Sequence, residues 1–216
     1  MRENVKEAYV YIYELLDKYS TQDYIKMAVK EYLCYSDALL KDKMFSDELF
    51  DIKRTLEGKP YFPNCKEIGF SVSHSGKYIV CAFSQGNIGV DIEQKGRWAD
   101  ESDEEYSNRL IKIAERFFHP DEASVVKINP KTRFYEVFTA KESYVKFTGT
   151  GFDEKLGENF VLPEDKNFPS CHKCLESVYW KAGMANYWQS IIDQNYVICV
   201  CAEQMISPHV VFCSVE

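Results

Sequence analysis

The stretch KYIVCAFSQGNIGVDIE, residues 77–93, carries the strongest β-strand signal of the chain. Residues 77–83 and 88–93 are apolar runs rich in β-branched side chains, and the four residues SQGN separate them. A four-residue connection that contains a glycine is typical of a β-hairpin. The pattern therefore predicts two strands that pair with each other.

Further elements are indicated on both sides of this stretch. Apolar residues recur at helical spacing over residues 133–148, and Gly149 fits the C-cap of that helix. The same spacing predicts a helix over residues 21–33. Residues 8–16 allow either a strand or a helix, and residues 41–69 are expected to be irregular. Short strands are expected in the last forty residues, at 177–180, 187–192, 196–202 and 209–215.

The chain is predicted to consist of two halves. An acidic, polar segment at residues 100–105 marks a boundary between an N-terminal half, residues 1–97, and a C-terminal half, residues 98–216. The pattern Tyr-aliphatic-aliphatic-Cys occurs once in each half, at residues 78–81 and 196–199. Four matching residues can arise by chance, so the repeat is a hint of internal duplication.

Composition limits the kinds of function that fit. The chain has 216 residues, of which 45% are hydrophobic, so it is long enough to bury a core. The net charge of −8 argues against nonspecific nucleic-acid binding, which needs a basic surface. The apolar run at residues 79–83 is far too short to cross a bilayer. We expect a cytoplasmic protein that binds neither nucleic acid nor membrane, in which any site for phosphate groups is a local cluster.

Eight cysteines are spread along the chain, several of them in strand-like apolar runs. A buried thiol in a reducing compartment behaves as a small apolar side chain, which we expect for most of them. Cys171 and Cys174 have the spacing of half a zinc site or of a redox pair, but no second Cys-x-x-Cys is present. We therefore expect ordinary loop thiols at these two positions.

Two carboxylates follow the apolar strand at residues 88–90. Asp91 and Glu93 are two residues apart, so a strand presents both on one face, where they can converge on one cation. Hard oxygen ligands favour Mg²⁺ or Mn²⁺ over zinc. Gly89 next to them would permit a ligand to approach closely. The alternative is a solvated strand end.

The helix predicted over residues 133–148 carries Lys141, Glu142 and Lys146. Glu142 and Lys146 are four residues apart, with the glutamate first, which suits a surface ion pair. In the functional alternative, Glu142 is a third metal ligand and Lys146 contacts a phosphate.

Residues 71–76, SVSHSG, combine three hydroxyls, an imidazole and a glycine just before a strand. Such groups suit phosphate oxygens. A catalytic Ser-His pairing and a simple polar turn are the alternatives, although the nucleophile-elbow spacing is missing.

Taken in order, these segments resemble the Sfp-type 4′-phosphopantetheinyl transferases over residues 58–152. The resemblance rests on GKP at 58–60, FSVSHS at 70–75, GVDIE at 89–93, FTAKESYVK at 138–146 and, more weakly, RFF at 116–118. In that family Phe138 is usually tryptophan and Ser143 usually alanine. The family also commonly places arginine and lysine on the N-terminal helix, where this chain has only Lys26 and Lys30.

The resemblance implies an α+β fold of two similar halves related by a pseudo-twofold axis, with coenzyme A in the cleft between them. It implies that Asp91, Glu93 and Glu142 hold Mg²⁺, with Mn²⁺ as an alternative. The resemblance also implies that Lys146 and Ser73 contact the pyrophosphate of coenzyme A.

The remaining coenzyme A contacts that the resemblance implies are basic. His74 is expected at the 3′-phosphate of the ribose and Lys59 near the adenine end. Lys26 is a further candidate for the 3′-phosphate, although lysine lacks the bidentate fork of arginine.

The implied reaction transfers 4′-phosphopantetheine from coenzyme A to a serine of an apo acyl or peptidyl carrier protein and releases 3′,5′-ADP. Glu142, as the candidate base, and Lys146 are the implied catalytic residues. We expect a monomer, since a duplicated chain supplies both walls of the cleft. Two alternatives come from other classes: a non-catalytic module that binds coenzyme A or a nucleotide, and a Mg²⁺-dependent phosphoesterase.

Overall fold

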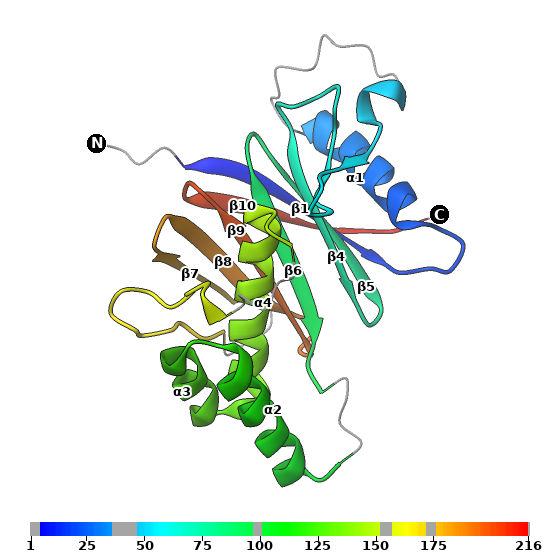
Figure 1. Ribbon diagram of the computed structural model, residues 1–216. Coiled ribbons are helices and arrows are strands. Elements are labelled where there is room, and N and C mark those ends of the chain that lie inside the picture. The colour runs from blue at the N-terminus through cyan, green and yellow to red at the C-terminus, as the bar shows by residue number, and fades with distance from the viewer. Residues whose placement is uncertain (1–4, 36–46, 97–100, 152–156, 172–175, 216) are drawn as a thin grey trace.

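The computed structural model describes residues 5–35, 47–96, 101–151, 157–171 and 176–215 (Figure 1). The predicted boundary at residues 97 and 98 and Cys174 lie outside the described residues. None of the helices in the described ranges is long and apolar enough to cross a membrane.

The first sheet has four strands in the order β10-β1-β5-β4. Its members are β1 (Lys6–Glu14), β4 (Gly69–Ser75), β5 (Tyr78–Ser84) and β10 (Ile206–Cys213). Strand β1 pairs in parallel with β10 and antiparallel with β5. Helix α1 (Thr21–Tyr35) packs on this sheet, and its buried face meets an aromatic cluster that includes Tyr24, Tyr32 and Phe83 (Figure 1).

Three short elements connect α1 to β4. They are η1 (Asp47–Phe50), β2 (Lys53–Arg54) and β3 (Pro60–Tyr61). Strands β2 and β3 pair with each other as a separate two-stranded sheet. The described part of residues 41–69 is therefore more ordered than expected.

The second sheet is antiparallel, in the order β6-β9-β8-β7. Its members are β6 (Ile88–Gln94), β7 (Ser177–Ala182), β8 (Ala185–Ile192) and β9 (Tyr196–Ala202). Helix α4 (Pro130–Thr148) packs against β6 and β9, and α2 (Asp103–Phe117) and α3 (Pro120–Ile128) pack against α4 (Figure 1). Gly149 ends α4 with a φ of 73°, which confirms the expected C-cap.

The two sheets share an apolar layer. Val80 and Ala82 of the first sheet belong to the same buried cluster as Val90, Ile198 and Val200 of the second. The fold is thus α+β with two four-stranded sheets, which confirms the predicted class.

The predicted hairpin is wrong, although its two strands are present. Strand β5 pairs with β1 on one side and β4 on the other, so neither of its edges is left for β6. Strand β6 pairs instead with β9 in the second sheet. The connection at residues 85–87, with Gly86 at a φ of 129°, carries the chain from one sheet to the other. A turn signal predicts a change of direction but not the pairing of the strands that follow.

The sheets do not strictly follow the two halves of the sequence. Strand β6 joins the C-terminal strands, and β10 returns to pair with β1. The repeated Tyr-aliphatic-aliphatic-Cys pattern nevertheless occupies matching places, because β5 and β9 each lie between two neighbours in their sheet. Their first residues, Tyr78 and Tyr196, are in edge-to-face contact with ring centroids 4.9 Å apart.

Candidate active site

Side chains from β4, β6 and α4 meet at a cavity of about 430 Å³. Thr21 of α1 and Arg54 of β2 also line this cavity, so chain segments that are remote in sequence supply one site. The polar residues that line the cavity are Thr21, Arg54, Ser73, His74, Asp91, Glu93, Glu142 and Lys146.

The centre of the site is a three-residue network. The Lys146 ammonium lies 2.6 Å from Asp91 Oδ1 and donates to Ser73 Oγ at 2.8 Å. The Ser73 hydroxyl donates to the same Asp91 oxygen at 2.7 Å. Asp91 has only 4% of its side chain exposed, so both partners hold a buried charge. Within the described part of the chain, the carboxylate paired with Lys146 is Asp91 rather than Glu142.

Two carboxylate oxygens at the cavity are left without a hydrogen bond. Asp91 Oδ2 and Glu142 Oε1 are buried and have no partner among the described residues. Burial, assisted by the negative charge of Asp91 and opposed by Lys146, raises the pKa of Glu142 to about 7. Unpaired buried carboxylate oxygens are costly, and a bound cation would satisfy them.

Glu93 lines the same cavity, but its carboxylate bonds to a different serine from the one that bonds to Asp91. Its Oε2 accepts a hydrogen bond of 3.0 Å from the Ser75 hydroxyl. In the described ranges no three acidic, histidine or cysteine side chains are gathered closely enough to hold an ion. Asp91, Glu93 and Glu142 therefore line one cavity, while the Lys146 ammonium takes the place next to Asp91.

The approach of β6 to α4 depends on Gly89. A Cβ at this position would lie 2.0 Å from the Ser143 carbonyl oxygen and 2.4 Å from the Phe147 nitrogen. The glycine thus serves close packing of the helix, not the approach of a ligand as predicted from the sequence. That packing brings Glu142 and Lys146 within reach of Asp91.

Lys59 lines a second cavity of about 250 Å³, which shares Arg54, Glu142 and Lys146 with the first. Its ammonium donates to the Phe147 carbonyl at 2.6 Å, at the C-terminal end of α4, and to Asn87 Oδ1. Burial lowers the pKa of Lys59 to about 8. The lysine therefore joins the two halves, with its stem in the cavity wall.

The two other predicted basic contacts are exposed. His74 lies on β4 at the first cavity, next to Ser73. Lys26 lies on the outside of α1 and lines neither cavity. The structure thus brings His74 to the site and leaves Lys26 away from it.

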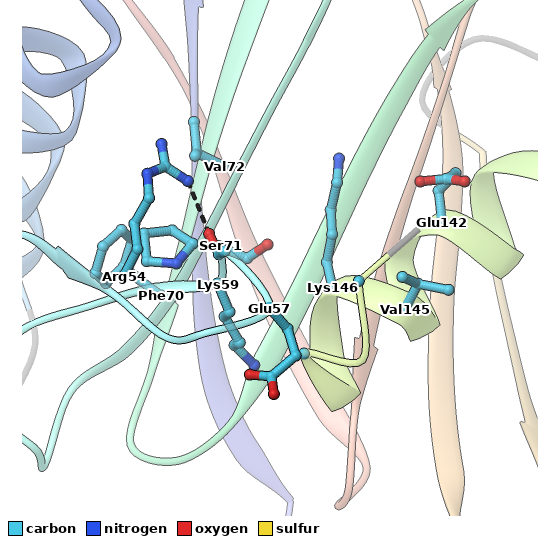
Figure 2. Close-up of a pocket in the computed structure, with 13 residues that line it drawn as sticks. Arg54, Glu57, Lys59, Phe70, Ser71, Val72, Glu142, Val145 and Lys146 are labelled. Carbon is cyan, nitrogen blue, oxygen red and sulfur yellow. Dashed lines mark hydrogen bonds between the residues drawn. The ribbon is translucent and has the colours of Figure 1, made fainter. Parts of the chain in front are cut away.

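Arg54 is the residue that sequence reasoning missed. It lines both cavities, and its guanidinium donates to the Gly58 carbonyl at 2.8 Å. Figure 2 shows Arg54 and Lys59 on one side of the second cavity, with Glu142 and Lys146 on α4 facing them. The available signal was an arginine four residues before the block GKP at 58–60.

Lys141, next to Glu142 in sequence, points away from the site. Its ammonium lies 2.6 Å from Glu122 Oε2, and both side chains are fully buried. The other Glu122 oxygen accepts from the Val161 backbone N–H at 2.8 Å. This pair ties α3 and α4 to the segment that follows them.

Cys171 is a buried thiol whose Sγ lies 3.3 Å from the Gln189 carbonyl oxygen. Burial raises the pKa of this thiol to about 12. A buried, protonated thiol is a poor metal ligand, because the thiolate is the binding form.

Comparison with known proteins places this chain in one family. The model of the 4′-phosphopantetheinyl transferase superfamily matches residues 87–201, more than half of the chain. The chain therefore belongs to that superfamily. The matched region includes Asp91, Glu93, Glu142 and Lys146.

Individual relatives agree with this assignment. The chain is 34% identical over 155 residues to the 4′-phosphopantetheinyl transferase Sfp of Bacillus subtilis strain 168. A 4′-phosphopantetheinyl transferase of Bacillus subtilis is 32% identical over 149 residues. Each match covers 67% of this chain and 59% of the relative. The gsp transferase of Aneurinibacillus migulanus is 39% identical over 114 residues, 51% of this chain and 41% of the relative. The chain thus spans roughly half the length of these relatives.

Proposed function

We propose that this chain transfers 4′-phosphopantetheine from coenzyme A to a serine of an apo acyl or peptidyl carrier protein and releases 3′,5′-ADP. The observation that carries the proposal is the Ser73–Asp91–Lys146 network, with Asp91 buried, at a cavity in a member of this superfamily. The relatives' names support the same reaction class.

A divalent cation fits the acidic side of the cavity. The unpaired oxygens Asp91 Oδ2 and Glu142 Oε1 are hard donors of the kind that Mg²⁺ and Mn²⁺ prefer. We propose that Asp91 and Glu142, with Glu93 beside them, hold Mg²⁺ or Mn²⁺. When bound, such an ion neutralises charge on phosphoryl oxygens.

The basic groups of the site are proposed to bind the phosphates of coenzyme A. The Lys146 ammonium and the Ser73 hydroxyl face the first cavity and suit the pyrophosphate. Arg54 lies where the two cavities meet, and its fork of donors suits phosphate oxygens. His74 is proposed to contact the 3′-phosphate. These groups supply locally the positive charge that the chain lacks as a whole, with its net charge of −8.

Glu142 is proposed as the catalytic base. The carrier serine oxygen forms a bond to the phosphorus that bears the pantetheine arm, and the bond from that phosphorus to 3′,5′-ADP breaks. The serine proton passes to Oε2 of Glu142, the oxygen that is not proposed to hold the cation, and Glu142 lines both cavities. Lys146 remains in place as a fixed positive charge opposite the developing negative charge.

One incubation separates the three functions that fit the residues. The chain is mixed with coenzyme A and Mg²⁺, with and without an apo carrier protein, and the nucleotide products are separated by chromatography. The transferase forms 3′,5′-ADP only when the carrier is present. Products formed from coenzyme A alone would indicate a phosphoesterase. Binding without any product in either mixture would indicate a non-catalytic module.

A further inference from the structure

Strands β4 and β6 lie side by side although they belong to different sheets. Ser71 and Ser73 share one face of β4, opposite Ala82 and Val80 of β5. Ala82 and Val80 belong to the apolar layer between the sheets. At the edge of that layer, hydroxyl groups therefore take the place of apolar side chains.

The outer serines of this row, Ser71 and Ser75, join β4 to the main chain of β6. Ser71 Oγ accepts a hydrogen bond of 3.0 Å from the Val90 backbone N–H, and Ser75 Oγ accepts one of 3.1 Å from the Gln94 N–H. Both bonds span nineteen positions in the sequence, so the two strands run in the same direction. We call these two contacts the serine bridges.

The serine bridges provide hydrogen-bond acceptors for outward N–H groups of β6. Among the strands that the structure describes, β6 lies at the edge of the second sheet, so no strand of that sheet accepts its outward N–H groups. Ser71 is 4% exposed and Ser75 1% exposed, which keeps water from taking over as the acceptor. Side-chain hydroxyls thus accept the N–H groups of Val90 and Gln94, where a backbone ladder would otherwise do so.

The middle serine is used differently. Ser73 donates its hydroxyl to Asp91 Oδ1 and accepts from Lys146. The two serine bridges flank this network along the same pair of strands. In addition, the Ser75 hydroxyl donates to Glu93 Oε2 at 3.0 Å. The bridges therefore fix where the carboxylates of β6 lie relative to the Ser73 hydroxyl.

We propose that Ser71 and Ser75 are positioning residues of the coenzyme A site. They set the spacing and register of β4, which carries Ser73 and His74, against β6, which carries Asp91 and Glu93. This inference rests on the proposed function for the identity of the ligand. The bridges themselves rest on the hydrogen bonds alone.

The test compares Ser71→Ala and Ser75→Ala with hydroxyl-retaining Ser71→Thr and Ser75→Thr. Ser75 lines neither of the two cavities, so its variants separate positioning from direct contact. Ser190→Ala is the matched control, because Ser190 is 2% exposed and its hydroxyl donates to the carbonyl of Glu176, which precedes β7 at the edge of the second sheet opposite β6. Two quantities are measured for each protein: the dissociation constant for coenzyme A by calorimetry with Mg²⁺ present, and amide hydrogen exchange at Val90 and Gln94 by NMR.

Each alanine variant is expected to bind coenzyme A about tenfold more weakly, which corresponds to the loss of one buried hydrogen bond. Its own bridged amide, Val90 or Gln94, is expected to exchange faster. The threonine variants should stay within about threefold of wild type, and Ser190→Ala should change neither quantity.

If Ser75→Ala bound coenzyme A with wild-type affinity while Gln94 exchanged faster, the positioning role would be overturned, although the Ser75–Gln94 hydrogen bond would stand. If the alanine variants left hydrogen exchange at both Val90 and Gln94 unchanged, the serine bridges themselves would be overturned. A wild-type chain that does not bind coenzyme A would overturn the proposed function, while the exchange data would still decide the bridges.

Discussion

The ammonium of Lys146 lies 2.6 Å from Asp91 Oδ1, although 55 positions separate the two residues in the sequence. Lys146 comes from the last turn of α4 and Asp91 from the middle of β6. An isolated charge at the nearly buried Asp91 would be costly, and Lys146 compensates it. Access of other cations to Asp91 should therefore depend on where this lysine points.

Lys146→Gln should consequently raise the affinity of the free chain for a divalent cation. Without the ammonium, Asp91 Oδ1 keeps only the Ser73 hydroxyl as a partner and can accept a cation, in addition to the unpaired Oδ2. We expect Mn²⁺ to bind about tenfold more tightly in the absence of coenzyme A, measured by electron paramagnetic resonance of the free ion. The same variant should bind coenzyme A more weakly. Mn²⁺ binding that is unchanged or weaker would show that Lys146 does not occupy this position.

Asp91→Asn should remove the negative charge of this side chain while keeping the shape of the side chain. The amide oxygen can still accept from Ser73, so the fold should persist. Transfer should fall by about 10²-fold or more, because both metal binding and the placement of Lys146 depend on the carboxylate. The rate is measured as formation of the modified carrier at millimolar Mg²⁺. Asp121→Asn, which changes a half-buried carboxylate on α3 that pairs with Lys166 away from the site, is the control. A wild-type rate for Asp91→Asn would remove Asp91 from the mechanism.

Glu142 should give the chain a measurable pH dependence of stability. Its pKa is raised from 4.5 to about 7 in the folded state, so between these values the folded chain holds a proton that the unfolded chain has released. The unfolded state then binds fewer protons, and the free energy of unfolding falls as the pH rises through this window, by up to about 3 kcal/mol.

Glu142→Gln removes this titration. In urea unfolding without divalent cations, the variant should gain stability relative to wild type between pH 5 and pH 8. Glu203→Gln, an exposed position, should follow the wild-type curve. Parallel curves for wild type and Glu142→Gln would contradict the burial of this carboxyl group.

The Glu122–Lys141 pair should contribute to stability and leave the chemistry intact. Lys141→Met leaves a fully buried carboxylate without its counter-ion and should cost about 3–5 kcal/mol in urea unfolding. Combining it with Glu122→Gln should recover part of that loss, since the uncompensated charge is gone. If Lys141→Met alone lowered the free energy of unfolding by less than about 1 kcal/mol, the two charges would not be desolvated together.

Much of the site follows from local sequence patterns. Alternation along β6 correctly placed Asp91 and Glu93 at one cavity, and helical spacing correctly placed Glu142 and Lys146 on one face of α4. These periodicities are properties of a single element, so a sequence reveals them directly.

What the sequence did not reveal depends on how elements meet. The pairing of β6 with β9 in place of β5 is set by which strand edges are already taken. The Lys146–Asp91 contact requires the close packing of α4 that Gly89 permits. Arg54 reaches the site from a two-residue strand that has no periodic signal.

The mass of the carrier protein itself tests the central claim most directly. An apo acyl or peptidyl carrier is incubated with this chain, coenzyme A and Mg²⁺, and its intact mass is measured, followed by mapping of the modified residue. The account predicts a gain of one 4′-phosphopantetheine group per carrier, located on a serine and absent when Asp91→Asn replaces the wild-type chain. If an acyl carrier and a peptidyl carrier both kept their original mass, even with the enzyme at the same concentration as the carrier, the result would contradict this account.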